Sequence, residues 1–131
     1  NLNIGKDEVL PFLEEQLILH HKLMLSNPKS TTNVKTILKA IDMIKGEILS
    51  EIAHLYRTLA DYDEIGDYES VTNEIATVIA MDYILARRLG IGYASIDKKI
   101  SELLGIGEEN GHELEIEFSD MSELKKYLKS R

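Results

Sequence analysis

Apolar residues in this chain recur mostly at intervals of three and four, the spacing that places side chains on one face of an α-helix. The most regular stretch covers residues 34–59, and residues 30–33 before it carry side-chain oxygens that can cap a helix N-terminus. A second stretch covers residues 68–89 and ends at Gly90, a residue type that favours the conformation found just after helices. Residues 61–67 between them are acidic and contain a glycine. The pattern predicts two long antiparallel helices joined by a loop.

Three shorter segments have the same spacing. Residues 7–25 predict an N-terminal helix, because Pro11 falls in its first turn and a second proline follows its end. Residues 95–104 predict a fourth helix, which Ser95 can cap. Residues 119–128 predict a last short helix capped by one of its first two residues.

The segment between the last two helices lacks helical spacing. Residues 105–111 contain three glycines and are predicted to form a loop. Residues 112–118 alternate glutamate with leucine, isoleucine and phenylalanine, which is typical of an extended strand. The chain offers no obvious partner strand, so an edge tether and part of an irregular helix are equally open interpretations.

The composition agrees with a helical chain. Tryptophan is absent, and only two prolines and eight glycines interrupt 131 residues. A chain of this length forms one core and buries roughly two thirds of the surface that it exposes when unfolded. We therefore predict one all-α domain over residues 1–131, an antiparallel helical bundle of four to five helices.

Charge and residue types narrow the function. The formal net charge is −8, which opposes binding to nucleic acid or to anionic membranes, although divalent ions can still bridge such a protein to phosphates. Cysteine is absent, which excludes thiol catalysis and thiolate metal sites. The apolar runs are too short for a membrane span and the N-terminus lacks a signal-peptide pattern, so we expect a cytoplasmic protein.

Carboxylates near the apolar stripes are the first candidates for chemistry. Glu47, Glu51 and His54 are spaced by four and three, so they project from neighbouring turns of one helix and can hold a metal ion. The pair Glu51 and His54 also forms a Glu-x-x-His half-motif of di-iron bundles, but the motif does not recur on a second helix. The alternative interpretation is a solvated polar edge.

Two acids lie on the next helix. Glu74 is flanked by apolar residues and needs a partner there, either a metal ion held jointly with Glu51 or a lysine or arginine. For Asp82 we favour a salt bridge. The other histidines, His20, His21 and His112, are interpreted as surface or capping residues.

The order of these features resembles the MazG-like family, a branch related to the all-α nucleoside triphosphate pyrophosphohydrolases. The segments that carry the resemblance are residues 46–55, 73–78, 83–91, 112–115 and 120–122. The resemblance implies a MazG-like region over residues 30–131, preceded by the N-terminal helix in residues 1–29.

Active members of the wider pyrophosphohydrolase superfamily hold Mg²⁺ against a nucleotide's phosphates with a Glu-x-x-Glu on one helix and a Glu-x-x-Asp on the next. Carried onto this chain, the four positions are Ile48, Glu51, Glu74 and Thr77, so two of the four carboxylates are replaced. Glu47 lies one residue from the first lost position, which is about 100° around the helix.

Three functions therefore compete. The first is a non-catalytic or weakly active relative with a regulatory or interaction role, which leaves a nucleotide and an unknown protein open as partners. The second is a Mg²⁺-dependent pyrophosphohydrolase that uses Glu51, Glu74 and Glu47. The third is a metal-binding bundle of other chemistry that adds His54 to these ligands. Under each we expect a homodimer, because an exposed apolar stripe on a long helix needs cover.

Overall fold

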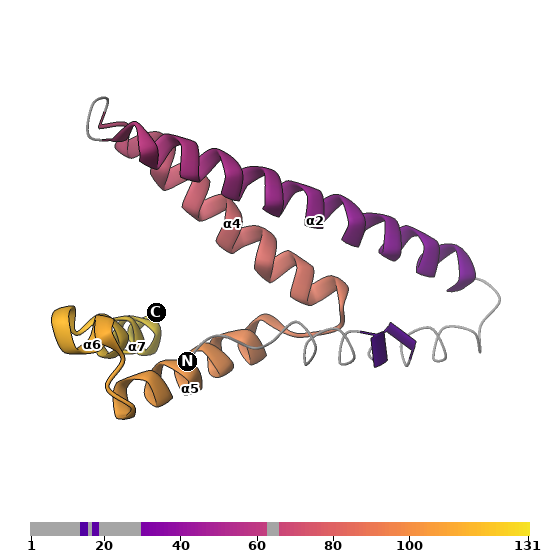
Figure 1. Cartoon of the computed structure of the whole chain (residues 1–131). Coiled ribbons are helices and arrows are strands. Elements are labelled where there is room, and N and C mark those ends of the chain that lie inside the picture. Colours follow the sequence, from indigo (N-terminus) through magenta and orange to yellow (C-terminus); the bar gives the residue numbers. More distant parts are fainter. Residues whose placement is uncertain (1–13, 16, 19–29, 63–65) are drawn as a thin grey trace. The chain divides into compact units, whose positions relative to one another are not determined.

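A computed structural model of the chain describes residues 14–15, 17–18, 30–62 and 66–131. The regular structure in these ranges is α-helical, with no strand, which confirms the predicted all-α class (Figure 1). The helices with described bounds are α2 (Ser30–Ala60), α4 (Tyr68–Arg88), α5 (Tyr93–Glu109), α6 (Glu113–Phe118) and α7 (Asp120–Ser130). Of the predicted helix over residues 7–25, only residues 14, 15, 17 and 18 are described, and they are helical; His20 and His21 lie outside the described residues.

The described helices belong to two compact units. One contains α2 and α4 and ends at Ile91, and the other contains α5, α6 and α7. Each unit is described by itself below. The single domain over residues 1–131 stays a prediction.

The first unit is a hairpin in which α4 runs back along α2 (Figure 1). Ile41 and Ile44 of α2 are 8% and 6% exposed, and Ala86 of α4 is also buried. Full burial of each isoleucine stabilises the fold by about 1.5–3 kcal/mol. Helix α2 begins at Ser30, so the predicted capping residues 30–33 form its first turn instead of preceding it.

Both ends of α4 are fixed by local hydrogen bonds. At its start, Asp67 accepts a hydrogen bond from the backbone N–H of Ser70 at 3.1 Å. At its end, Gly90 has φ +84°, its N–H donates to Arg87 O at 3.0 Å, and the Ile91 N–H donates to Ala86 O at 2.8 Å. This is a Schellman motif, which satisfies carbonyls that the helix cannot pair internally. The predicted end of the helix at Gly90 is confirmed.

In the second unit, α5 is longer at both ends than the sequence predicts. It begins at Tyr93, two residues before the predicted cap, and continues through the predicted 105–111 loop as far as Glu109. The glycines stay helical because α7 lies against them. A Cβ on Gly107 would stand 3.6 Å from Met121 Sδ, and one on Gly105 would stand 3.6 Å from Lys125 Nζ.

Residues 112–118 are not extended, and the helical alternative is the correct one. His112 precedes α6, and its Nδ1 accepts a hydrogen bond from the Leu114 N–H at 3.1 Å, which confirms the capping role. Glu115 Oε2 in turn accepts from the Ser122 N–H in the first turn of α7 at 2.9 Å. No strand exists in the described residues to pair with this segment, and local caps therefore decide its conformation.

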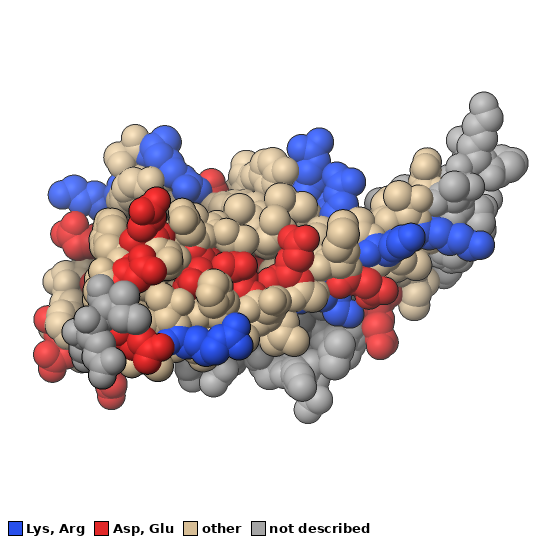
Figure 2. All heavy atoms as spheres, turned by 90° about the horizontal axis from the view of Figure 1, so that it is seen from above, with Lys and Arg blue, Asp and Glu red and all other residues tan. Residues whose placement is uncertain are grey.

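None of the described helices combines the length and the apolar character that a membrane span requires. Figure 2 shows acidic side chains exposed among lysine and arginine side chains on the face in view. This distribution agrees with the net charge of −8.

Candidate functional site

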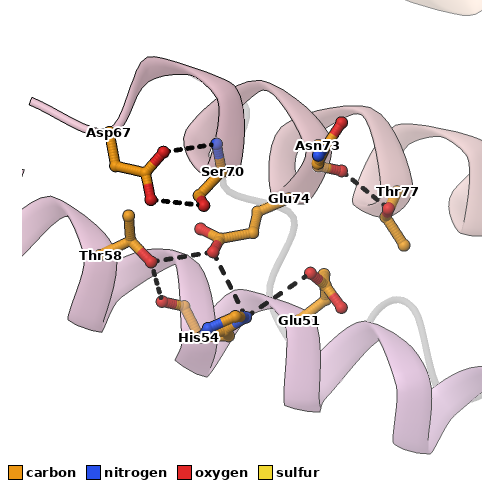
Figure 3. Close-up of polar contacts among 8 residues, drawn as sticks. All are labelled: Glu51, His54, Thr58, Asp67, Ser70, Asn73, Glu74 and Thr77. Carbon is orange, nitrogen blue, oxygen red and sulfur yellow. Dashed lines mark hydrogen bonds and ion pairs between the residues drawn. The ribbon is translucent and has the colours of Figure 1, made fainter.

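Glu51, His54, Thr58 and Glu74 form a polar cluster in the hairpin, and Glu74 lies at its centre. It lies in the second turn of α4, faces α2, and is only 2% exposed. Its Oε1 accepts a hydrogen bond from the Thr58 hydroxyl at 2.8 Å. Thr58 comes from the last turns of α2, so this bond joins the two helices near the loop (Figure 3).

His54 connects the two predicted ligand carboxylates. Its Nδ1 lies 3.3 Å from Glu74 Oε1 and 3.9 Å from Glu51 Oε1. Figure 3 shows the imidazole between these two carboxylates, one from its own helix and one from α4. The His54 side chain is 58% exposed, whereas that of Glu51 is 29% exposed. The cluster is therefore open to solvent on the His54 side and closed at Glu74.

The second oxygen of Glu74, Oε2, is shielded from solvent and has no hydrogen-bond partner among the residues that the structure describes. Burying a polar atom without a partner costs about 1–3 kcal/mol. A bound cation, or a hydrogen-bond donor from outside the described residues, would offset this cost. This oxygen is the strongest indication that this position serves something other than stability.

The remaining family positions do not add carboxylates to the cluster. Ile48 is half-buried in the hairpin, and Glu47 is exposed beside it. Thr77 donates its hydroxyl to the carbonyl of Asn73 at 2.7 Å, a bond within its own helix (Figure 3). The structure brings Glu51, His54 and Glu74 together, whereas Glu47 has no described contact with them.

Thr58 is a member of the cluster that sequence reasoning missed. It lies four residues after His54 and seven after Glu51, so the helical spacing that selected those two residues also reaches Thr58. Its hydroxyl lies 3.1 Å from the His54 carbonyl as well as 2.8 Å from Glu74. The hydroxyl of a threonine in a helix commonly bonds only to the backbone of that helix, so the residue type alone does not indicate a contact with a second helix.

A small cavity lies beside the cluster at the loop end of the hairpin. It has a volume of about 260 Å³ and is lined by His54, Arg57, Thr58, Asp61 and Asp67. The Ser70 hydroxyl and backbone N–H both bind Asp67 and lower the pKa of its carboxyl. Asp67 is therefore engaged as a helix cap, and the Thr58 hydroxyl is engaged with Glu74, which leaves His54 and Arg57 as the other lining residues that carry donor groups.

Asp82 does not form the salt bridge that the sequence favoured. It has no ion pair within the described ranges 30–62 and 66–131, and partial burial raises the pKa of its carboxyl. The predicted salt bridge of Asp82 is therefore not found within these described ranges.

The donor set fits a Mg²⁺ ion only in part. Mg²⁺ takes six oxygen ligands in strict octahedral geometry, and two carboxylates next to an imidazole supply few of them. Among the described residues, no three aspartate, glutamate or histidine side chains are arranged to hold a metal ion. The residues as placed do not make a Mg²⁺ site, and the metal role of Glu47, Glu51, His54 and Glu74 stays a prediction.

Comparison with known proteins agrees with the all-α fold. Residues 34–121, about two thirds of the chain, match the model of the MazG-like family. The matched region includes both helices of the hairpin and continues to the start of α7. No match was found among curated proteins or among solved structures.

Proposed function

This chain belongs to the MazG-like family, and we propose that it is a non-catalytic or weakly active relative of the nucleoside triphosphate pyrophosphohydrolases. In this proposal it keeps the helical scaffold and has a regulatory or interaction role. The observation that carries the proposal is the state of Glu74, whose Oε1 is already bonded by Thr58 and lies beside His54. A protein hydroxyl thus occupies an oxygen that an active relative would offer to a metal ion.

The lost family positions support the same conclusion. Ile48 offers no ligand atom, and the hydroxyl of Thr77 donates to its own helix. A neutral hydroxyl also stabilises Mg²⁺ much less than a carboxylate does. With Glu51 and Glu74 as the remaining carboxylates of the pattern, the protein supplies too little negative charge to hold Mg²⁺ ions firmly against a nucleotide's phosphates.

One observation favours a second candidate function, a Mg²⁺-dependent pyrophosphohydrolase. Glu74 Oε2 is buried and receives no hydrogen bond from the described part of the chain, and a cation bound beside it would offset the cost of this burial. In this alternative Glu51 and Glu74 would hold Mg²⁺ with help from Glu47. The ion would neutralise phosphate charge and activate water when bound.

An assay of pyrophosphate release distinguishes the non-catalytic relative from the Mg²⁺-dependent pyrophosphohydrolase. The purified chain at about 50 µM is incubated with Mg²⁺ and each of the nucleoside and deoxynucleoside triphosphates. We expect release no faster than that of the Glu51→Ala/Glu74→Ala variant. Mg²⁺-dependent release that this double variant loses would establish the enzyme and overturn the proposal.

The third function, a metal-binding helical bundle of other chemistry, is tested by the metal content of the purified protein. It requires a transition metal that stays bound through dialysis and is lost in His54→Ala, because an imidazole is the ligand that such metals prefer. Elemental analysis of the purified protein measures this directly. We expect no stoichiometric metal in the wild-type chain.

A further inference from the structure

The short helix α6 has no buried residue, although it carries three large apolar side chains. Leu114 is 44% exposed, Ile116 is 72% exposed and Phe118 is 66% exposed. Side chains of these types usually lie inside a fold. Burial of its own apolar residues therefore does not explain why this segment is helical.

Hydrogen bonds hold α6 at both of its ends. At its start, His112 Nδ1 accepts from the Leu114 N–H at 3.1 Å. At its end, the Ser119 N–H donates to the Glu115 carbonyl at 2.9 Å, and Glu115 Oε2 accepts from the Ser122 N–H of α7 at 2.9 Å. A segment that is already held in one conformation loses little conformational entropy when a partner binds it. Helix α6 thus presents its apolar side chains in a preorganised form.

The side of α6 that faces away from α7 combines glutamates with these apolar residues. Helix α6 packs against α7, and its bond to Ser122 turns Glu115 toward that helix. Glu113 and Glu117 are each two residues from Glu115, a rotation that places both about 160° away from it. By the same geometry Ile116 flanks the two glutamates on one side, and Leu114 and Phe118 flank them on the other.

The charge of the whole chain is concentrated around this helix. Residues 108–124 contain seven acidic side chains and no lysine or arginine, so this segment carries a charge of −7 out of the net −8. The remainder of the chain is close to neutral. Among the described residues, no three acids are arranged to hold a metal ion, so a bound metal does not account for this charge.

We propose that α6 is a docking surface for a basic segment of another protein, which places lysine or arginine against Glu113 and Glu117 and apolar side chains against Ile116 and Phe118. The inference rests on the interaction role in the proposed function and names the chemistry of the partner.

Charge and area both favour a partner of this kind. The seven carboxylates repel phosphate groups, which opposes nucleic acid and anionic lipid as the occupant, whereas they attract lysine and arginine. From their exposed fractions, Leu114, Ile116 and Phe118 present on the order of 400 Å² to solvent. Transient complexes bury less than about 1,200 Å² in total, so we expect an affinity in the micromolar range.

The test is fluorescence anisotropy of a labelled helical peptide of about 15 residues, titrated with the full chain at about 0.15 M salt. The peptide has two arginines four residues apart with leucines on both sides of them. Two matched peptides replace the arginines with glutamate or the leucines with alanine. We expect the wild-type chain to bind the arginine–leucine peptide at least tenfold more tightly than either matched peptide, because the surface recognises both charge and apolar area.

Variants of the chain locate the site. Phe118→Ser is expected to weaken binding about tenfold, whereas its control Tyr56→Ser, at an equally exposed aromatic residue of the hairpin, is expected to bind like wild type. Glu117→Lys is expected to weaken binding about fivefold, and Glu69→Lys, at an exposed acid of α4, less than twofold.

Three results would overturn the docking proposal. These are no binding of the arginine–leucine peptide at about 200 µM chain, equal binding of the glutamate peptide, and equal effects of the α6 variants and their controls. Mg²⁺-dependent pyrophosphate release would instead overturn the proposed function and leave these peptide affinities unchanged, so the two failures are distinguishable.

Discussion

At the scale of single residues, Glu74 is the feature that separates function from stability in this hairpin. A carboxylate that is 2% exposed, with one oxygen unpartnered, costs free energy that an apolar side chain would not. The apolar residues around Glu74 predicted that it lies close to the buried side of its helix, and the sequence left open whether its partner is a metal ion shared with Glu51 or a basic side chain. The hydrogen bond from Thr58 to Glu74 depends on the position of α4 along α2. The residue pattern within a single helix does not determine this position.

Glu74→Met is expected to raise the free energy of unfolding by about 1 kcal/mol, because it removes the unpartnered oxygen and keeps the volume filled. The Thr58 hydroxyl keeps an acceptor in the His54 carbonyl, 3.1 Å away. Urea unfolding monitored by circular dichroism measures the change. Glu51→Met is the control, expected near zero because its side chain is 29% exposed. A loss of more than about 1 kcal/mol in Glu74→Met would mean that the carboxylate stabilises the hairpin.

At the scale of helices and their ends, local capping hydrogen bonds determine the conformation of the segments that hydrophobic spacing did not assign. The spacing of α2 and α4 was sufficient to locate both helices within a few residues. It failed for α5 and α6, because Gly107 is helical through its contact with Met121 and α6 is capped by His112. Such contacts depend on residues more than a turn away, and an alternating pattern of seven residues cannot exclude them.

Two glycine-to-alanine substitutions are expected to have opposite effects. Gly90→Ala should lower the free energy of unfolding by about 1 kcal/mol, because φ +84° is costly for any residue with a Cβ. Gly46→Ala should raise it by about 0.5–1 kcal/mol, since Gly46 is inside α2 and a Cβ there meets no atom within 4 Å. Thermal unfolding of both variants checks the signs, and a stabilising Gly90→Ala would exclude the Schellman motif.

The bond between α6 and α7 predicts a pH dependence. The backbone N–H of Ser122 lowers the pKa of Glu115, so this carboxylate contributes stability above its unfolded pKa of about 4.5. That contribution is lost as the pH falls through the lowered folded value. Melting temperatures from pH 7 to pH 3 should therefore fall less steeply in Glu115→Gln than in wild type.

Glu117→Gln is the control for the pH series, because Glu117 is an exposed acid of the same short helix. Its melting temperatures should follow those of wild type across the range. Identical slopes for Glu115→Gln and wild type would show that the bond to Ser122 does not stabilise the folded chain.

At the scale of the whole molecule, the described residues have few buried apolar side chains and many exposed ones. Ile41, Ile44, Ala86, Leu104 and Met121 are the buried apolar residues, and none of the described large side chains is less than 2% exposed. The homodimer that the sequence predicts would bury some of these exposed side chains. The sequence predicted both the all-α class and the need for cover, but not which side of the hairpin is exposed, because that depends on how α2 and α4 face one another.

If two copies associate, stability must depend on concentration. The melting temperature of the wild-type chain is expected to rise by several degrees between about 1 and 100 µM, because association binds only the folded state. Leu49→Glu/Ile79→Glu places charges at two exposed apolar positions of the hairpin and should show no such rise. Differential scanning fluorimetry over this range is sufficient, and a wild-type melting temperature that does not change with concentration would contradict the expectation.

The claim that the polar cluster has lost its Mg²⁺ site is tested most directly by calorimetric titration of Mg²⁺ into the full chain. We predict no saturable heat up to about 1 mM Mg²⁺ for wild type. Thr77→Asp, which restores a third carboxylate beside Glu74, should gain saturable binding, whereas Thr72→Asp should not, because Thr72 makes the same bond within α4 on another face. Saturable binding by wild type that disappears in Glu51→Ala/Glu74→Ala would contradict the account and would identify the cluster as a working metal site.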